Sequence, residues 1–369
     1  MNTEQLLTIV RQITDDEQRL NIQAKLHELT AALTNFAGNP QNPAMQTEVA
    51  SKLDHLAETL RMLENDHSPV FKGRIEGLGA LPYFSLAMAR RLRQSMDENP
   101  MTPAVVQRES EQLLQERAAF LGSLTNLRDN LTTLGFAEDA LEPGEAEIGF
   151  QIPRAIFDNE LGGFSRELHE LHLIIRAFSE AAGNPGERVE LRQISTTDPL
   201  LFFWLHRHTI RLIGEGIKWC LELWKTSAEL RHARSMTANL SAVPAAKSLV
   251  EQFDAIIKET VGTRVREEAE RISRQSGAEI HRQNEMSNHL AHALEGMFAR
   301  VERGMTVEIR FLPPPQLSTE EENGNEQAAP DFDELKQLQQ HLVFPAASDE
   351  PVLKITKQPE DETKETPAD

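Results

Sequence analysis

The residues of this sequence best suited to chemistry are two pairs of histidines. His169 and His172 flank Glu170 in the run HELH, and His289 and His292 repeat the same spacing. On a helix, a spacing of three residues brings both imidazoles of a pair near one face, where they could ligate a metal ion. The zinc-protease motif instead places its histidines four residues apart, and no third ligand is evident. The pairs are therefore candidate metal ligands, with solvated surface histidines as the alternative.

Three other motifs carry less chemistry. Residues 73–79 (GRIEGLG) have no following Lys-Ser/Thr and no preceding apolar strand, so a glycine hinge is favoured over a phosphate-binding loop. Ser165 follows two glycines without the GxSxG pattern of a nucleophile elbow, and is expected at the start of a helix. Cys220 is the single cysteine and lies in an apolar stretch, which predicts a buried, inert thiol. The sequence therefore predicts no catalytic residue and no cofactor.

The chain is acidic, with 58 Asp and Glu against 38 Lys and Arg and a formal net charge of −20. Residues 313–369 hold fourteen acidic residues and four lysines, which is half of the net charge. Nonspecific nucleic-acid binding needs clustered cations, so bulk nucleic acid is not expected as a partner. Arg90, Arg91 and Arg93 form a local basic cluster, and residues 199–247 are also locally basic. Either region could receive the chain's own acidic tail or a phosphate-bearing partner.

Residues 313–369 combine few aromatic residues with a high net charge. Such a segment buries too little apolar surface to offset chain entropy, so a disordered acidic tail is predicted. Within it, Phe332, Leu335, Leu338 and Leu342 recur at helical spacing. They predict a short helix that orders in a partner's groove or docks on the chain's own body, with a transient helix as the alternative.

The first 140 residues show two apolar stripes with alternating spacings of four and three residues. Such spacing is typical of helices that pack lengthwise on one another. The break at 38–40, followed by Asn42 as N-cap and Pro43 at the first helical position, predicts an antiparallel helical hairpin. Another helix is expected from Thr102-Pro103 onward. The stripes consist of Ile22, Leu26, Leu29, Leu33 and Phe36, and of Val49, Leu53, Leu56, Leu60 and Leu63.

Alternating apolar residues after position 140 indicate half-buried strands. They predict strands near 146–152, 187–195 and 305–312. The last two are expected to pair antiparallel, because that register sets Glu190 opposite Arg310. Helices are predicted near 164–182, 199–232 and 245–303, the last being one long helix or two in line.

The segment 199–232 is predicted to be a single helix with Asp198 as N-cap and Pro199 as its first residue. Its charges follow one narrow stripe, so most of its circumference needs cover by a protein core or an oligomer interface. Gly214 and Gly216 would permit close backbone approach. The charges leave no apolar span of about 20 residues, as a transmembrane helix would need. Membrane-surface insertion of its first residues is the alternative.

Taken together, these patterns predict a mainly α protein with a small β-sheet. A helical bundle or coiled-coil domain is expected over 1–140, an α+β domain over 141–312, and the acidic tail over 313–369. The N-terminal residues lack the apolar core of a signal peptide, which favours the cytoplasm.

The function favoured by these features is that of a non-enzymatic interaction or accessory protein, which forms a homo-oligomer through helices and engages a protein partner. One alternative is an enzyme or metalloprotein that uses the histidine pairs, and a second is a membrane-associated effector. The residues expected to make the interactions are Phe203, Trp204, Ile217, Trp219, Leu221, Trp224, Phe332, Leu335 and Leu338.

Overall fold

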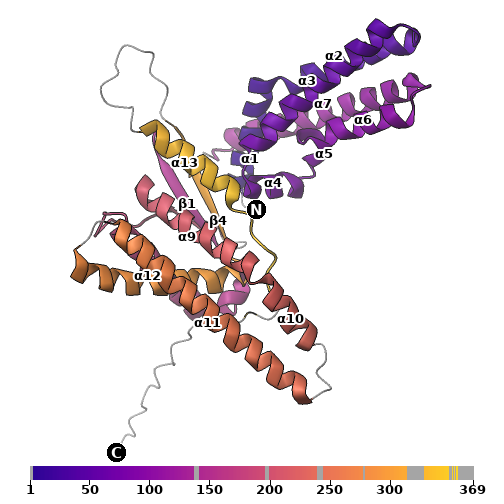
Figure 1. The fold of residues 1–369 in the computed structure, drawn as a ribbon. Coiled ribbons are helices and arrows are strands. Elements are labelled where there is room, and N and C mark those ends of the chain that lie inside the picture. Colours follow the sequence, from indigo (N-terminus) through magenta and orange to yellow (C-terminus); the bar gives the residue numbers. More distant parts are fainter. Residues whose placement is uncertain are drawn as a thin grey trace, which may run out of the picture. The chain divides into compact units, whose positions relative to one another are not determined.

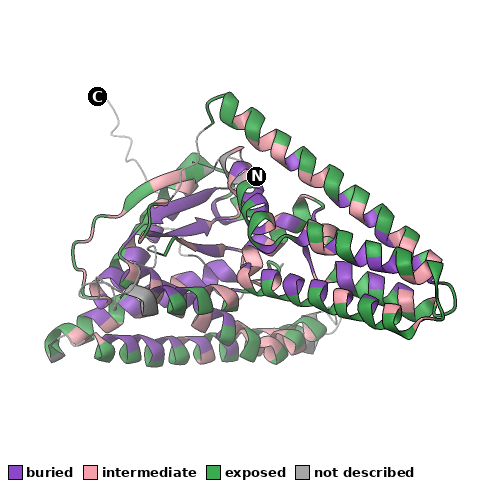
Figure 2. Ribbon diagram, turned by 90° about the horizontal axis from the view of Figure 1, so that it is seen from above, coloured by how far each residue is buried: buried purple, intermediate pink, exposed green. Residues whose placement is uncertain are grey.

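The protein is mainly helical with one small antiparallel sheet, as the sequence predicts. A computed structural model describes residues 3–136, 141–195, 199–238, 244–276, 279–313 and 328–348, together with 351, 353 and 355. The chain divides into two compact units, residues 1–141 and 142–369, each with its own hydrophobic core. Figure 2 shows that buried residues follow one side of the long helices and fill the strands.

Unit 1 is a bundle of helices. Helix α2 packs lengthwise against both α3 and α7, and α6 closes on α3 and α7 (Figure 1). The predicted hairpin is thus formed by α2 and α3, and Asn42 caps α3 by accepting a hydrogen bond from the backbone N–H of Ala44. The helices are α1 (Thr3–Leu20), α2 (Ile22–Gly38), α3 (Pro43–Asp66), α4 (Pro69–Gly77), α5 (Leu81–Phe84), α6 (Ala87–Glu98) and α7 (Pro103–Thr133).

A fully buried arginine joins the helices of unit 1. Arg117 of α7 donates hydrogen bonds to Oε2 of Glu17 (2.5 Å), Oε1 of Gln23 (2.8 Å) and the carbonyl of Tyr83 (3.0 Å). Its guanidinium also lies 4.8 Å from the centre of the Phe84 ring. Burial lowers the pKa of Arg117, and the contact with Glu17 opposes that shift. One cation therefore ties α7 to α1, α2 and α5.

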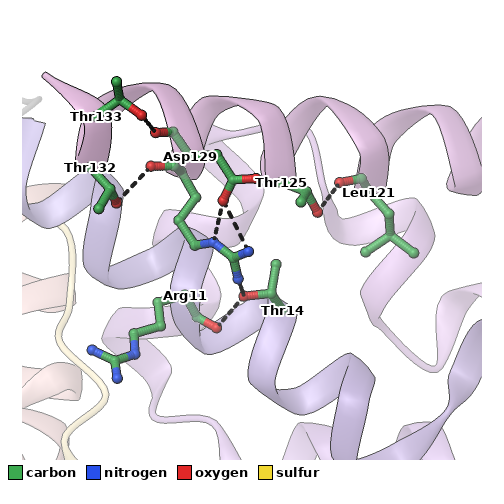
Figure 3. Close-up of polar contacts among 8 residues, drawn as sticks. Arg11, Thr14, Leu121, Thr125, Asp129, Thr132 and Thr133 are labelled. Carbon is green, nitrogen blue, oxygen red and sulfur yellow. Dashed lines mark hydrogen bonds and ion pairs between the residues drawn. The ribbon is translucent and has the colours of Figure 1, made fainter.

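Two smaller polar contacts hold α1 in place. Arg128 of α7 donates to Oγ1 of Thr14 (3.3 Å), and this hydroxyl donates in turn to the carbonyl of Arg11 (2.8 Å; Figure 3). At the other contact, the buried ring of His67 lies 2.7 Å from Oδ2 of Asp16. These bonds attach α1 to α7 and to the end of α3.

Unit 2 contains a four-stranded antiparallel sheet in the order β2-β3-β1-β4. Its strands are β1 (Ala146–Gln151), β2 (Glu190–Ser195), β3 (Leu200–Trp204) and β4 (Thr306–Phe311). The three predicted strands are present, but the predicted pairing of β2 with β4 is wrong because they lie at opposite edges. Arg310 instead faces Glu147 on β1, with 3.3 Å between Nη1 and Oε1.

The prediction of a single helix over 199–232 is also wrong, because its first part is a strand and its last part is divided at Ser227 between α9 (Arg207–Thr226) and α10 (Ala228–Ala238). Residues 200–204 form the inner strand β3, whose unbroken apolar run suits a strand covered on both faces. The helix begins only at Arg207, where His206 is the N-cap and accepts a hydrogen bond from the backbone N–H of His208. Asp198, the expected cap, lies outside the described residues.

Helix α9 is the centre of unit 2. It packs against β1 and β4 on one side and against α8, α12 and α13 on others (Figure 1). Helices α11 and α12 lie side by side, so the prediction of one helix or two in line over 245–303 is wrong. The helical elements are η1 (Arg154–Phe157), α8 (Leu161–Ala181), α9 (Arg207–Thr226), α10 (Ala228–Ala238), α11 (Pro244–Gln275), α12 (Ile280–Val301) and α13 (Ala328–His341).

Helix α13 docks on the chain's own body, one of the two positions expected for it. Phe332, Leu335 and Leu338 are buried against α9 and β4. At the rim, Arg211 pairs with Glu334 at 2.8 Å. The prediction of disorder from 313 onward is therefore corrected for 328–348, because this apolar stripe finds a matching surface. Most other residues of the predicted tail lie outside the described part.

Replacing Arg117 with alanine is expected to lower the free energy of unfolding by about 3 kcal/mol, because Glu17 and Gln23 lose their buried partner. Urea titration measures the loss, and hydrogen exchange should rise in peptides from α2 and α7. Arg108 lies exposed on the same helix, so Arg108→Ala removes the same charge and should change stability by less than about 0.5 kcal/mol. Equal effects of the two variants would contradict the role given to Arg117.

Gly214→Ala is expected to loosen α13, because a Cβ at this position would lie 2.3 Å from Cδ2 and 3.1 Å from Cγ of Leu338, so that this buried side chain must shift. Hydrogen exchange over 328–342 should increase at least about tenfold, the equivalent of about 1.4 kcal/mol. Gly262→Ala is the matched control, since a Cβ on this helical glycine meets nothing within 4 Å. It should stabilise α11 by about 0.5–1 kcal/mol. Unchanged protection of α13 in Gly214→Ala would show that the close approach is not needed.

Candidate functional site

A groove of about 530 Å³ opens at the surface of unit 2 beside helix α8. Residues of η1, α8 and α12 line it, and Ile355 contributes from near the end of the chain. Its apolar wall includes Phe157 and Leu173. This size falls within the range of small-ligand sites. The polar side chains that line it are Asp158, Ser165, Arg166, Glu167, His169, Glu170 and His292.

The start of α8 explains how these residues come together. Gly163 lies so close to η1 that a Cβ there would be 2.4 Å from the carbonyl oxygen of Phe157. Between the two elements, Asp158 and Asn159 both adopt positive φ, 54° and 56°, which Asp and Asn tolerate better than other side chains with a Cβ. Nη1 of Arg154 donates to Oδ1 of Asn159 at 3.0 Å. The chain therefore reverses sharply here and sets η1 against the first turns of α8.

Glu167, which lines the groove, belongs to a buried ion pair. Arg300 of α12 donates two hydrogen bonds to the carboxylate of Glu167 on α8, at 2.7 and 3.2 Å, and both side chains are at least 95% buried. Arg300 also donates to the carbonyl of Gly296 at 3.0 Å. Removing one partner of such a pair typically costs 3–5 kcal/mol, so the pair fixes α8 relative to α12. This pair was not predicted from the sequence. The sequence feature that could have indicated it is the position of Arg300 directly after the apolar residues of α12.

The groove unites half of the predicted histidine candidates. His169, Glu170 and His292 line it, and Nε2 of His292 lies 3.7 Å from Oε2 of Glu170. His172 and His289 are exposed elsewhere on the same two helices. Within the described part of the chain, no group of three or more His, Cys, Asp or Glu side chains could hold a metal ion. The His292–Glu170 contact is solvent-exposed and contributes less than about 1 kcal/mol.

The predicted interaction residues lie mostly inside unit 2. Phe203, Ile217 and Leu221 are buried in its core, as are Phe332, Leu335 and Leu338 of α13. Trp219 and Trp224 are partly buried against that core, whereas Trp204 keeps 39% of its surface exposed. Most of these residues therefore pack in the core of unit 2 and do not form an exposed contact surface.

The other sequence motifs have structural roles. Cys220 is buried in α9, where loss of hydration raises the pKa of its thiol far above the ordinary range, as expected for an inert cysteine. Ser165 lies in the early part of α8, as expected, and Glu160 is the N-cap. Most of the glycine-containing run at 73–79 lies in α4, and Gly79 turns the chain with a φ of 69°.

Most of the residues expected to insert into a membrane surface, at the start of the segment 199–232, are not exposed. Residues 200–203 are buried within the sheet as part of β3. Among the helices of the described residues, none combines the length and the apolar character needed to cross a bilayer.

No protein-family model, no curated protein and no solved structure matches this chain. The function proposed below therefore depends on the chain's own surfaces and side chains.

Proposed function

We propose that this chain is a non-enzymatic interaction protein that self-associates through helices and engages a protein partner. The observation that carries the proposal is an unburied apolar stripe on α11, made of Leu249, Phe253 and Ile256. Leu249 and Ile256 keep 46% and 47% of their surface exposed, and Phe253 is half-buried. The cytoplasmic location expected from the sequence remains a prediction.

The first turns of α11 differ from the rest of the helix. Between 247 and 256 no described side chain is buried, whereas Ile257, Val261 and Val265 begin a fully packed face. On the neighbouring side, Arg234 of α10 forms an ion pair with Asp254 at 2.5 Å. Leu249 and Ile256 thus remain exposed beside this contact with α10, and Phe253 is only partly covered.

The occupant proposed for this stripe is a second copy of the same helix. Leu249, Phe253 and Ile256 have successive spacings of four and three residues, the spacing at which two helices pack along their length. A second copy presents the same stripe, so an isologous twofold contact satisfies both at once. Met236 of α10 is 58% exposed and adds to the apolar surface of this hairpin.

Light scattering on the full chain should give a mass of at least twice the 41.5 kDa of one chain. The double variant Leu249→Glu/Ile256→Glu should be monomeric, because two buried carboxylates would face their counterparts across the twofold axis. Leu161 is 85% exposed on α8, so Leu161→Glu is the matched control and should retain the wild-type mass. A monomeric wild-type chain at micromolar concentration would disprove self-association.

A second candidate function, a histidine-dependent enzyme or metalloprotein, is favoured by one observation. His169, Glu170 and His292 share the groove although 122 residues separate the two histidines. An imidazole near a carboxylate in a groove is one arrangement used for general acid–base catalysis. The exposed 3.7 Å contact lacks the close hydrogen bond that orients such a pair.

Zinc titration tests the metalloprotein form of this second candidate. Because the described residues offer no cluster of three ligands, we expect the wild-type chain to bind zinc no more tightly than His169→Ala/His292→Ala. Calorimetry on both proteins measures this, and His172→Ala/His289→Ala controls for the loss of two histidines outside the groove. Stoichiometric zinc lost only in the groove variant would instead establish the metalloprotein.

A further inference from the structure

A cavity of about 280 Å³ in unit 1 collects arginine side chains from two helices. Arg90 and Arg93 reach it from α6, and Arg61 reaches it from α3. Arg91, although part of the same basic cluster in the sequence, turns away and pairs with Glu109 of α7 at 2.6 Å. The fold thus removes one arginine from the predicted cluster and adds another from a distant segment.

The apolar part of the lining of this arginine cavity consists of two alanines and one leucine. Ala57 of α3 and Ala89 of α6 are 7% and 3% exposed, and Leu86 completes the lining. The two alanines lie where α3 and α6 meet, and their small side chains leave a space between the helices. The aliphatic parts of the arginine side chains surround this space. A charged group that enters the cavity would therefore contact guanidinium groups, and the apolar lining would reduce its hydration.

The three arginines of the cavity differ in their ion-pair partners. Arg93 pairs with Asp54 and Arg61 with Glu58, and all four of these side chains are more than half exposed. Solvent and salt screen such pairs, so an incoming anion displaces them easily. Arg90 makes no ion pair with any residue that the structure describes. A third carboxylate, that of Glu64 on α3, is held at this place by the backbone N–H of Leu86, which donates to its Oε1 at 2.6 Å.

We infer that this cavity binds an oxyanion carried by a protein partner, either the phosphate of a phosphorylated side chain or a carboxylate. The inference rests on the proposed function, because it assigns the chemistry by which a partner is engaged. Guanidinium groups present paired N–H donors that match the oxygens of phosphate and carboxylate. Arg90 supplies the unpaired donor, and Arg61 and Arg93 exchange exposed partners for the ligand.

Fluorescence anisotropy on the full chain tests this with a labelled peptide that carries one phosphoserine between alanine and glycine residues. We expect wild-type binding that weakens at least fivefold in Arg90→Ala. Arg91→Ala removes the same charge one residue away, outside the cavity, and should change affinity less than twofold. Equal effects of the two variants, or no binding to wild type at millimolar protein, would overturn the inference.

Two sister peptides identify the source of the oxyanion. A peptide with glutamate in place of phosphoserine should bind if a carboxylate suffices, and only the phosphopeptide should bind if phosphate is required. Either result supports the oxyanion site. A peptide with unmodified serine that binds as tightly as the phosphopeptide would overturn it, since affinity would then not depend on the anion.

A variant that is expected to raise the affinity distinguishes an effect on binding from a loss of folding. Asp54→Asn/Glu58→Gln removes the two competing carboxylates, so phosphopeptide affinity should increase severalfold, and an unchanged or weaker affinity would contradict the exchange of partners. Light scattering on the same samples separates the two proposals. Loss of peptide binding at unchanged mass rejects the arginine cavity alone, whereas a monomeric wild-type chain rejects self-association alone.

Discussion

Unit 2 is organised by the need to cover helix α9. Its described side chains Ile210, Ile213 and Ile217 are fully buried, and apolar residues occupy most of the helix circumference. A helix of this kind has no stable position at a surface, because each large apolar side chain left in water forfeits about 1.5–3 kcal/mol. The sheet, α8, α12 and α13 each cover part of it. Gly214 and Gly216 allow this, since a Cβ at either position would collide with Leu338 or Phe178.

The same requirement explains what became of the acidic C-terminal segment. Its composition predicts disorder, yet Phe332, Leu335 and Leu338 fit against α9 and β4. Composition averages over a segment, whereas a few apolar residues at helical spacing are enough where a complementary surface already exists. Gln339 then secures the helix by donating from Nε2 to the carbonyl of Ile309 at 2.8 Å. Helix α13 thereby covers the chain's own core, although the sequence was equally compatible with its docking in the groove of a partner.

Sequence periodicity predicts elements well where apolar residues recur at a regular spacing, even in β1, which is buried on both faces. Helices α2 and α3 follow from spacings of four and three residues, and β1 and β4 follow from alternation. Strand β3 has neither signal, because Leu200–Trp204 is apolar on both faces and resembles the start of the apolar helix after it. The charge argument for pairing β2 with β4 failed for an energetic reason. Cross-strand ion pairs contribute too little to set strand order, and burial placed Glu147 opposite Arg310 instead.

The candidate sites show the same limit at longer range. His169 and Glu170 share one helix and can be grouped from sequence, but His292 joins them only because α8 packs against α12 around Glu167 and Arg300. Arg90 and Arg93 are likewise grouped by local spacing, whereas α3 must pack against α6 before Arg61 can join them. The net charge of −20 does not reveal a local basic cluster of this kind. It sums charges over the whole chain, whereas salt screens a charge over roughly 8 Å. Anion binding by an acidic protein therefore depends on which helices meet, and the helices that meet around Arg90 are set by the apolar stripes of unit 1.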